Sequence, residues 1–144
     1  MFGNGTVLDV SPHPSPEDHA ALRALGHEVV VCNGPGSGGC PLLEAGTCAL
    51  AETADGVVFR LDLDTPYHRD LLAAYRAATG GTSPLHVVVE PGEDRRHARI
   101  LAGLPVTCGA LGPALLGLSS QVSMAAEARF GLFHTDEAWF CDVE

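Results

Sequence analysis

The sequence predicts a three-layer αβα fold, in which helices cover both faces of a five-stranded parallel β-sheet. Two observations carry this prediction. Five short runs of residues are almost wholly apolar, and each is followed by a stretch rich in helix-forming residues. Strands that are buried on both faces lose the alternation of polar and apolar residues, which is typical of parallel sheets in α/β proteins. The 144 residues are about the size of one domain.

The first two strands are expected at Thr6–Val10 and Glu28–Cys32, where apolar residues dominate. The proline-rich segment 11–16 ends the first strand, because alternate prolines prevent regular backbone hydrogen bonding. A helix follows, with Ser15 as its N-cap and proline at its first position, and Gly26 closes it.

The middle of the chain predicts a short helix over 42–53, interrupted near Gly46, and a third strand over 56–61. A further helix begins at Thr65 and Pro66, and the glycine pair at 80–81 ends it.

The pattern repeats toward the end of the chain. We expect a strand at 85–89, a helix at 93–102, a strand at 105–108 and a last helix from 113 to about 130. Right-handed crossovers then favour the flavodoxin-like strand order 2-1-3-4-5, with a ligand crevice at the carboxyl ends of strands one and three. Residues 1–131 form the predicted domain, and 132–144 form a tail that either packs on it or docks a partner.

Charge and composition restrict the classes of partner. The chain has 18 acidic residues against eight arginines and no lysine, for a formal charge of −10. Such a surface repels phosphate backbones and anionic lipids, so we expect neither nucleic acid nor membrane as a direct partner. We see no export signal and no apolar run that could cross a bilayer, and expect a cytoplasmic protein. An odd count of five cysteines argues against a disulfide framework.

Three segments resemble the receiver domain of bacterial response regulators, over roughly residues 5–130. They are ALGHEVV at 24–30, which leads from helix to strand, ADGVV at 54–58, which enters the third strand, and Leu71-Leu72 with Tyr75-Arg76 in the following helix. The resemblance implies a receiver-like fold.

The resemblance also implies a set of catalytic groups, most of which this chain lacks. Receivers hold Mg²⁺ with an acidic pair after the first strand, of which Asp9 supplies half. Counted from Asp55, the position of their phosphoacceptor aspartate falls on Arg60, and Glu90 replaces their hydroxyl residue after the fourth strand. Without lysine or a complete metal site, phosphoryl transfer loses most of its electrostatic stabilisation. The resemblance therefore implies a degenerate pseudo-receiver without catalysis.

The least accidental feature of the sequence is the set Cys32, Cys40 and Cys48, spaced eight residues apart around a glycine-rich segment. As a metal site, these thiolates would bind Zn or an iron–sulfur cluster, with Cys108, Cys141 or a histidine as fourth ligand. As a thiol switch, they would form a disulfide or react with a ligand. The third interpretation is packing, with the cysteines as small apolar residues.

Two further sets are candidate binding residues. The amides of the glycine-rich segment could cradle a phosphate, through Gly34, Gly36, Gly38 and Gly39. Polar residues near the carboxyl ends of the strands are candidates for a metal or acid/base site in the crevice: Asp9, His13, Asp62, Asp64 and Glu90. Asp18 and His19 lie close by in sequence, but the simpler interpretation is that Asp18 caps a helix and that His19 is solvated.

Together these observations favour a regulatory module without catalysis that binds a protein partner or dimerises, with the cysteine segment as its sensing or ligand element. The alternative is a small metal- or thiol-dependent enzyme, or a redox or metal sensor, that uses Cys32, Cys40 and Cys48.

Overall fold

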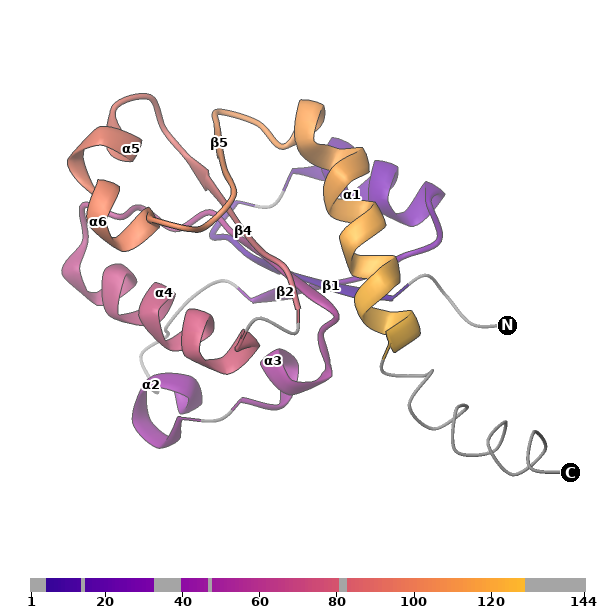
Figure 1. Ribbon diagram of the computed structural model, residues 1–144, viewed down its shortest axis with the longest axis horizontal. Helices are drawn as coiled ribbons and strands as arrows, with labels where there is room; N and C mark the ends of the chain where they lie inside the picture. The colour runs from indigo at the N-terminus through magenta and orange to yellow at the C-terminus, as the bar shows by residue number, and fades with distance from the viewer. Residues whose placement is uncertain (1–4, 14, 33–39, 47, 81–82, 129–144) are drawn as a thin grey trace, which may run out of the picture.

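The chain folds around one parallel five-stranded sheet with the order β2-β1-β3-β4-β5 (Figure 1). The computed structural model describes residues 5–13, 15–32, 40–46, 48–80 and 83–128. The strands are β1 Thr6–Val10, β2 Glu28–Cys32, β3 Gly56–Phe59, β4 Leu85–Val89 and β5 Val106–Cys108. The predicted fold class and strand order are confirmed.

Helices connect successive strands and begin where the sequence predicts. Ser15 caps α1 by accepting a hydrogen bond from the backbone N–H of Asp18 at 3.3 Å, and Gly80 ends α4 in the left-handed conformation that glycine tolerates. The helices are α1 Pro16–Ala24, α2 Pro41–Ala45, α3 Ala49–Thr53, α4 Pro66–Thr79, α5 Glu93–Arg96 and α6 Ala98–Leu101, followed by the 3₁₀ turn η1 Gly112–Ala114 and a last helix over 115–128.

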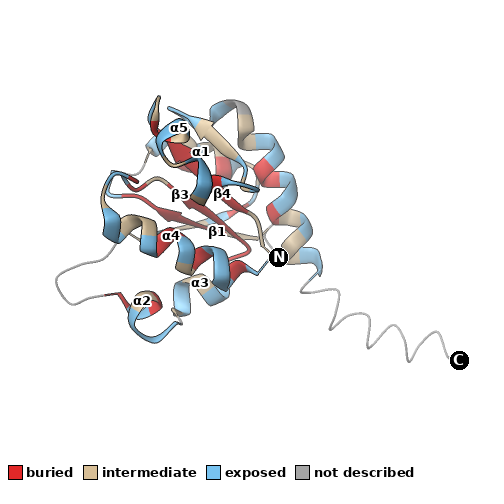
Figure 2. Cartoon of the chain, turned by 60° about the vertical axis from the view of Figure 1, so that its left-hand side comes forward, coloured by how far each residue is buried: buried red, intermediate tan, exposed pale blue. Residues whose placement is uncertain are grey.

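Two apolar clusters, one on each face of the sheet, form the core. Figure 2 shows the central strands buried between helices whose outer faces are exposed. On one face, α2, α3 and α4 cover a cluster that includes Phe59 and Tyr75, whose rings meet edge to face with centroids 6.2 Å apart. On the other face, α1 and the last helix cover a smaller cluster, to which they contribute Leu22, Leu118 and Val122.

Successive residues of a strand point to opposite faces of the sheet, and this sets the side on which each candidate residue lies. In β1, Leu8 and Val10 belong to the cluster under α4, and Val7 belongs to the cluster under α1. Asp9 therefore points toward α1. Cys32 pairs with Val10 across the sheet, so its side chain points to the same face as Val10 and packs against the cluster under α4.

Two elements differ from the prediction. The third strand ends at Phe59 rather than at 61, because its partner β1 ends at Val10, which pairs with Phe59. The helix predicted over 93–102 is broken into α5 and α6 at His97, whose backbone angles of φ −120° and ψ 31° are not helical.

Among the described residues, no helix has the length and apolar character needed to span a membrane.

Candidate functional site

The carboxyl edge of the sheet holds a buried charged network centred on Asp9. This carboxylate is 1% exposed. Its Oδ2 lies 2.6 Å from His19 Nε2, and its Oδ1 accepts a hydrogen bond from Arg60 Nε at 3.1 Å. An ionised carboxylate can only accept, so the Nε2 of His19 carries the hydrogen in this pair. Both oxygens of Asp9 are thus bound by side-chain donors of the protein.

Arg60 ties together three parts of the chain that are distant in sequence. It follows β3, and its backbone N–H donates to the carbonyl of Val10 at the end of β1. Its Nη2 donates to Asp18 Oδ2 in the first turn of α1 at 2.8 Å, while its Nε binds Asp9. The Arg60 side chain is only 12% exposed, so this guanidinium lies between two carboxylates in a mostly buried position.

His19 corrects one interpretation of the sequence. We expected a solvated histidine, yet its side chain is 9% exposed and pairs with Asp9. The available signal was periodicity, because His19 lies three residues before the buried Leu22 on α1, and residues at this spacing share a helix face.

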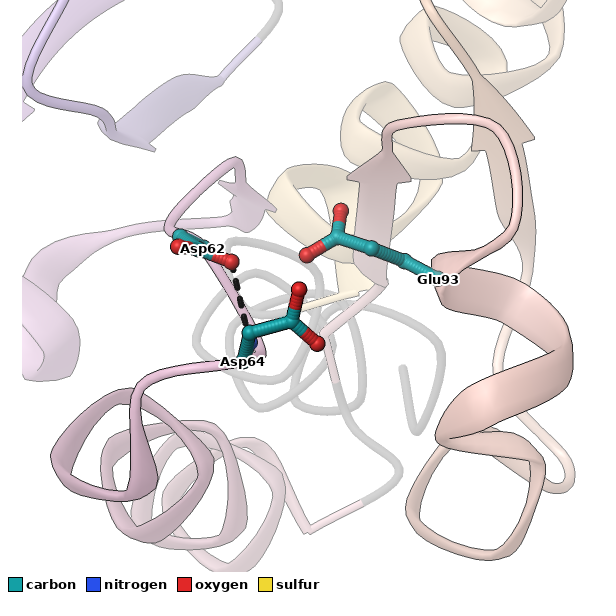
Figure 3. Close-up of side chains that lie close together, drawn as sticks. All are labelled: Asp62, Asp64 and Glu93. Atoms are coloured by element: carbon teal, nitrogen blue, oxygen red, sulfur yellow. Dashed lines mark hydrogen bonds between the residues drawn. The ribbon is translucent and has the colours of Figure 1, made fainter.

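A second polar cluster at the same edge is formed by Asp62, Asp64 and Glu93, which point toward one another in Figure 3. One ligand atom from each lies within 4.8 Å of the others. Asp62 and Asp64 come from the segment between β3 and α4, and Glu93 begins α5. The sequence predicted the two aspartates and Glu90 as site residues; the structure adds Glu93 and leaves Glu90 exposed.

The carboxylates of this second cluster are engaged by donors of the protein. Glu93 is 4% exposed and accepts from the backbone N–H groups of Leu63 at 3.0 Å and Glu90 at 2.7 Å. Glu93 therefore connects the loop after β3 with the turn after β4.

Asp64, half exposed, accepts from His97 Nε2 at 2.8 Å and from Arg96 Nη2 at 2.9 Å. The hydrogen bond from His97, and next that from Arg96, hold the pKa of the Asp64 carboxyl below its ordinary value. These contacts build a loop–loop junction from three acidic residues.

The predicted crevice residues thus divide into two networks. Asp9 is paired with His19 and Arg60. Among the described residues, the acidic cluster consists of Asp62, Asp64 and Glu93, and Asp9 is not part of it. His13 is exposed and appears in neither network; its backbone N–H donates to Ser11 Oγ at 3.1 Å.

The three cysteines spaced eight residues apart all pack with the apolar cluster on the α4 face of the sheet. Cys32 ends β2, Cys40 immediately precedes α2, and Cys48 immediately precedes α3. The same cluster contains Tyr75 of α4, whose side chain is 1% exposed. Burial first, and then these thiols, raise the pKa of Tyr75, so its hydroxyl remains a hydrogen-bond donor. The four glycines of the predicted phosphate cradle (Gly34, Gly36, Gly38 and Gly39), Cys141 and the tail 132–144 lie outside the described residues.

Comparison of the chain with models of known protein families and with curated proteins found no match.

Proposed function

We propose that the chain is a receiver-like regulatory module without phosphotransfer activity, which acts by binding a protein partner or a second copy of itself. The observation that carries this proposal is the pairing of Arg60 with Asp9 and Asp18. Counted from Asp55 as in receivers, Arg60 falls at the phosphoacceptor position, and a guanidinium cannot serve as a nucleophile.

The state of Asp9 supports the same proposal. In receivers this position helps to bind Mg²⁺, and a hard cation is bound through carboxylate oxygens. Here both Asp9 oxygens accept hydrogen bonds from side chains that lie 12% exposed or less. A metal ion at either Asp9 oxygen would have to compete with a contact already made there, and one of the two contacts is to a permanent cation.

The surroundings of the network lack the remaining receiver groups. Glu90 follows β4 where receivers carry a hydroxyl residue, and the whole sequence contains no lysine that could follow β5. The fold is retained while the groups that move a phosphoryl group are replaced, which favours a scaffold for regulated contacts over an enzyme.

The test is exposure of the purified chain to acetyl phosphate and Mg²⁺, with the intact mass as readout and a phosphorylatable receiver domain as positive control. We expect no added phosphoryl group on the chain. Addition of one that Asp62→Asn or Asp64→Asn abolishes would contradict the proposal and identify the acceptor. The interaction part is tested by sedimentation velocity over a range of concentrations, where a mass that rises toward a dimer identifies a second copy as partner.

A further inference from the structure

The outer face of the last helix (Figure 1) carries two large apolar side chains that stand in solvent. Leu116 is 71% exposed and Met124 is 67% exposed, the two highest values among the exposed large apolar residues that the structure describes. We propose that this face is the contact between two copies of the chain, which pack helix against helix around a two-fold axis. The inference rests on the proposed function, because it names the surface and the partner for one of the two interactions proposed there.

This helix is apolar on two opposite sides. Leu118 and Val122 point inward and belong to the cluster on the α1 face of the sheet. Leu116 and Met124 lie on the outer side with the exposed Ser120 between them, at the spacing of four residues that places side chains on one helix face. A surface helix of a monomer usually carries a single apolar stripe, and a helix that is apolar all round is usually buried. The outer stripe therefore indicates a contact surface.

The distribution of charge identifies a second copy as the partner. Residues 100–126 contain no acidic, basic or histidine side chain, although the chain has 18 acidic and eight basic residues and a formal charge of −10. This segment comprises the end of α6, the edge strand β5, η1 and most of the last helix. Two acidic copies repel each other, and a two-fold contact applies the same patch of surface to itself. A charge-free face suits such a contact, because it brings no like charges together.

A partner of another kind is better matched by other surfaces of the chain. Complementary charge gives an interface its specificity and speeds association, so a basic protein would bind where acidic side chains are exposed. Such side chains lie on the first four helices, at Glu17, Glu44, Glu52 and Asp70. In the described part of the last helix, Glu127 is the only acidic residue. The outer face of this helix therefore favours self-association over a basic partner.

The spacing of the outer residues sets the geometry of the contact. Leu116 lies about one turn before Ser120, and Met124 lies about one turn after it. With the two-fold axis beside Ser120 the helices cross antiparallel, and Leu116 of one copy meets Met124 of the other. Gly117 and Ser120 are small and exposed, which lets the two helices approach closely where they cross.

The same geometry keeps the two copies of Glu127 apart. At a rise of about 1.5 Å per residue, Glu127 lies roughly 10 Å along the helix from Ser120, on the side away from Leu116. The two Glu127 side chains are therefore separated by more than the Debye length of about 8 Å at physiological ionic strength, and their repulsion is largely screened. A contact made mainly by two helices is at the low end of interface sizes, so we expect a weak dimer that forms as the concentration rises.

The test is sedimentation velocity of the full chain over a wide range of concentrations, with variants at the two outer side chains. The unaltered chain should shift from monomer to dimer as its concentration rises. Leu116→Glu and Met124→Glu should each weaken dimerisation by about 100-fold or more, because each places a carboxylate against an apolar side chain in both halves of the contact. An unaltered chain that stays monomeric throughout would overturn the inference.

Tyr67→Glu is the matched control. Tyr67 is also a large exposed side chain, but it lies in the first turn of α4, on the opposite face of the sheet from the last helix. This variant should dimerise as the unaltered chain does. Dimerisation that survives Leu116→Glu and Met124→Glu, or that Tyr67→Glu abolishes, would overturn the inference, because the contact would then lie on another surface.

A measurement on the unaltered chain covers the case in which a variant fails to fold. Its two methionines are Met1 and Met124, so isotopic labelling of the methionine methyl groups gives one NMR signal from the proposed contact and one from outside it. A soluble paramagnetic agent should broaden the Met124 signal in dilute, monomeric protein, and dimerisation should protect that signal. Protection in the monomer would mean that the same chain covers the face, and exposure in the dimer would mean another contact; either result overturns the inference.

Failure of this inference and failure of the proposed function are distinguishable. None of these readouts involves phosphoryl transfer, so the test with acetyl phosphate is independent of them. A dimer that forms through another surface contradicts the helix contact and leaves the proposed function standing. Phosphorylation of a chain that dimerises through the last helix does the reverse.

Discussion

Arg60 Nε donates a hydrogen bond to Asp9 Oδ1 over 3.1 Å, joining the residue after β3 to the buried acid of β1. This pair places a permanent cation at the topological switch point of the sheet, where ligands of open α/β folds bind. A guanidinium is held there by two carboxylates, of Asp9 and Asp18. The chain therefore neutralises its own crevice acids.

Loss of Asp9 should destabilise the fold. Removing one partner of a buried ion pair costs about 3–5 kcal/mol because the other charge is left uncompensated. Arg60 keeps Asp18 and is 12% exposed, so we expect Asp9→Ala to lower the free energy of unfolding by about 3 kcal/mol, the lower end of that range. Urea denaturation measures this value. Glu44→Ala, at an exposed position, is the control and should change it by less than about 0.5 kcal/mol.

A double-mutant cycle isolates the pair itself. Asp9→Ala and Arg60→Ala, combined, should show a coupling energy of about 0.5–3 kcal/mol, the range for residues in direct contact. Additive effects would mean that the two side chains do not interact in solution.

The tight packing of the last helix against β3 gives a second prediction. A Cβ added to Gly56 would lie 2.5 Å from Val122 Cγ2, closer than packed atoms allow. Gly56→Ala should therefore cost about 1–3 kcal/mol of stability, as overpacking does. Gly117→Ala is a matched control within the last helix, where an added Cβ meets nothing within 4 Å, and it should be neutral or stabilising. Thermal unfolding measures the stability of both variants. Equal melting temperatures for Gly56→Ala and Gly117→Ala would contradict the described packing.

Much of this fold could be predicted from local sequence, and the exceptions have tertiary causes. Ser15 and Pro16 specify the start of α1 by their own chemistry, and the observed helix begins there. The break at His97 could not be read in this way, because residues 93–102 contain good helix formers. It accompanies contacts to distant residues: Glu93 turns inward to bind Leu63, and His97 binds Asp64.

The candidate site was predictable in its location but not in its pairings. Parallel topology places the ends of β1 and β3 side by side, so Asp9, Asp62 and Asp64 were expected at one edge of the sheet, whereas the pairing of Asp9 with Arg60 was not predicted. The partner of Asp9 on α1, His19, depends on how that helix is rotated against the sheet, which local composition does not specify. The choice of Glu93 over Glu90 likewise depends on the turn after β4, where Gly92 adopts a φ of +97°.

His86 should make stability depend on pH. Burial first, and then the positive charge of Arg60, lower its pKa from the ordinary value of 6.5. The unfolded chain therefore binds a proton more readily than the folded chain, so the free energy of unfolding should fall as the pH decreases below 6.5 toward the folded-state pKa. Urea denaturation at several pH values measures this.

His86→Gln removes the titrating group and should flatten that part of the pH profile. Because Arg60 contributes to the shift, Arg60→Met should raise the pKa of His86 toward its ordinary value, which an NMR titration of the ring measures directly. An unchanged pKa in that variant would contradict an electrostatic link between the two residues.

The central claim is that His19 and Arg60 engage the two carboxylate oxygens of Asp9 and thereby keep this carboxylate from binding a metal ion. The most direct test is titration of the isotopically labelled chain with Mg²⁺, following the carboxyl carbon signals of Asp9 and Asp18 by NMR, with Arg60→Met as the comparison. The account predicts no saturable change of either signal in the unaltered chain. A saturable shift of the Asp9 carboxyl signal in the unaltered chain would contradict it.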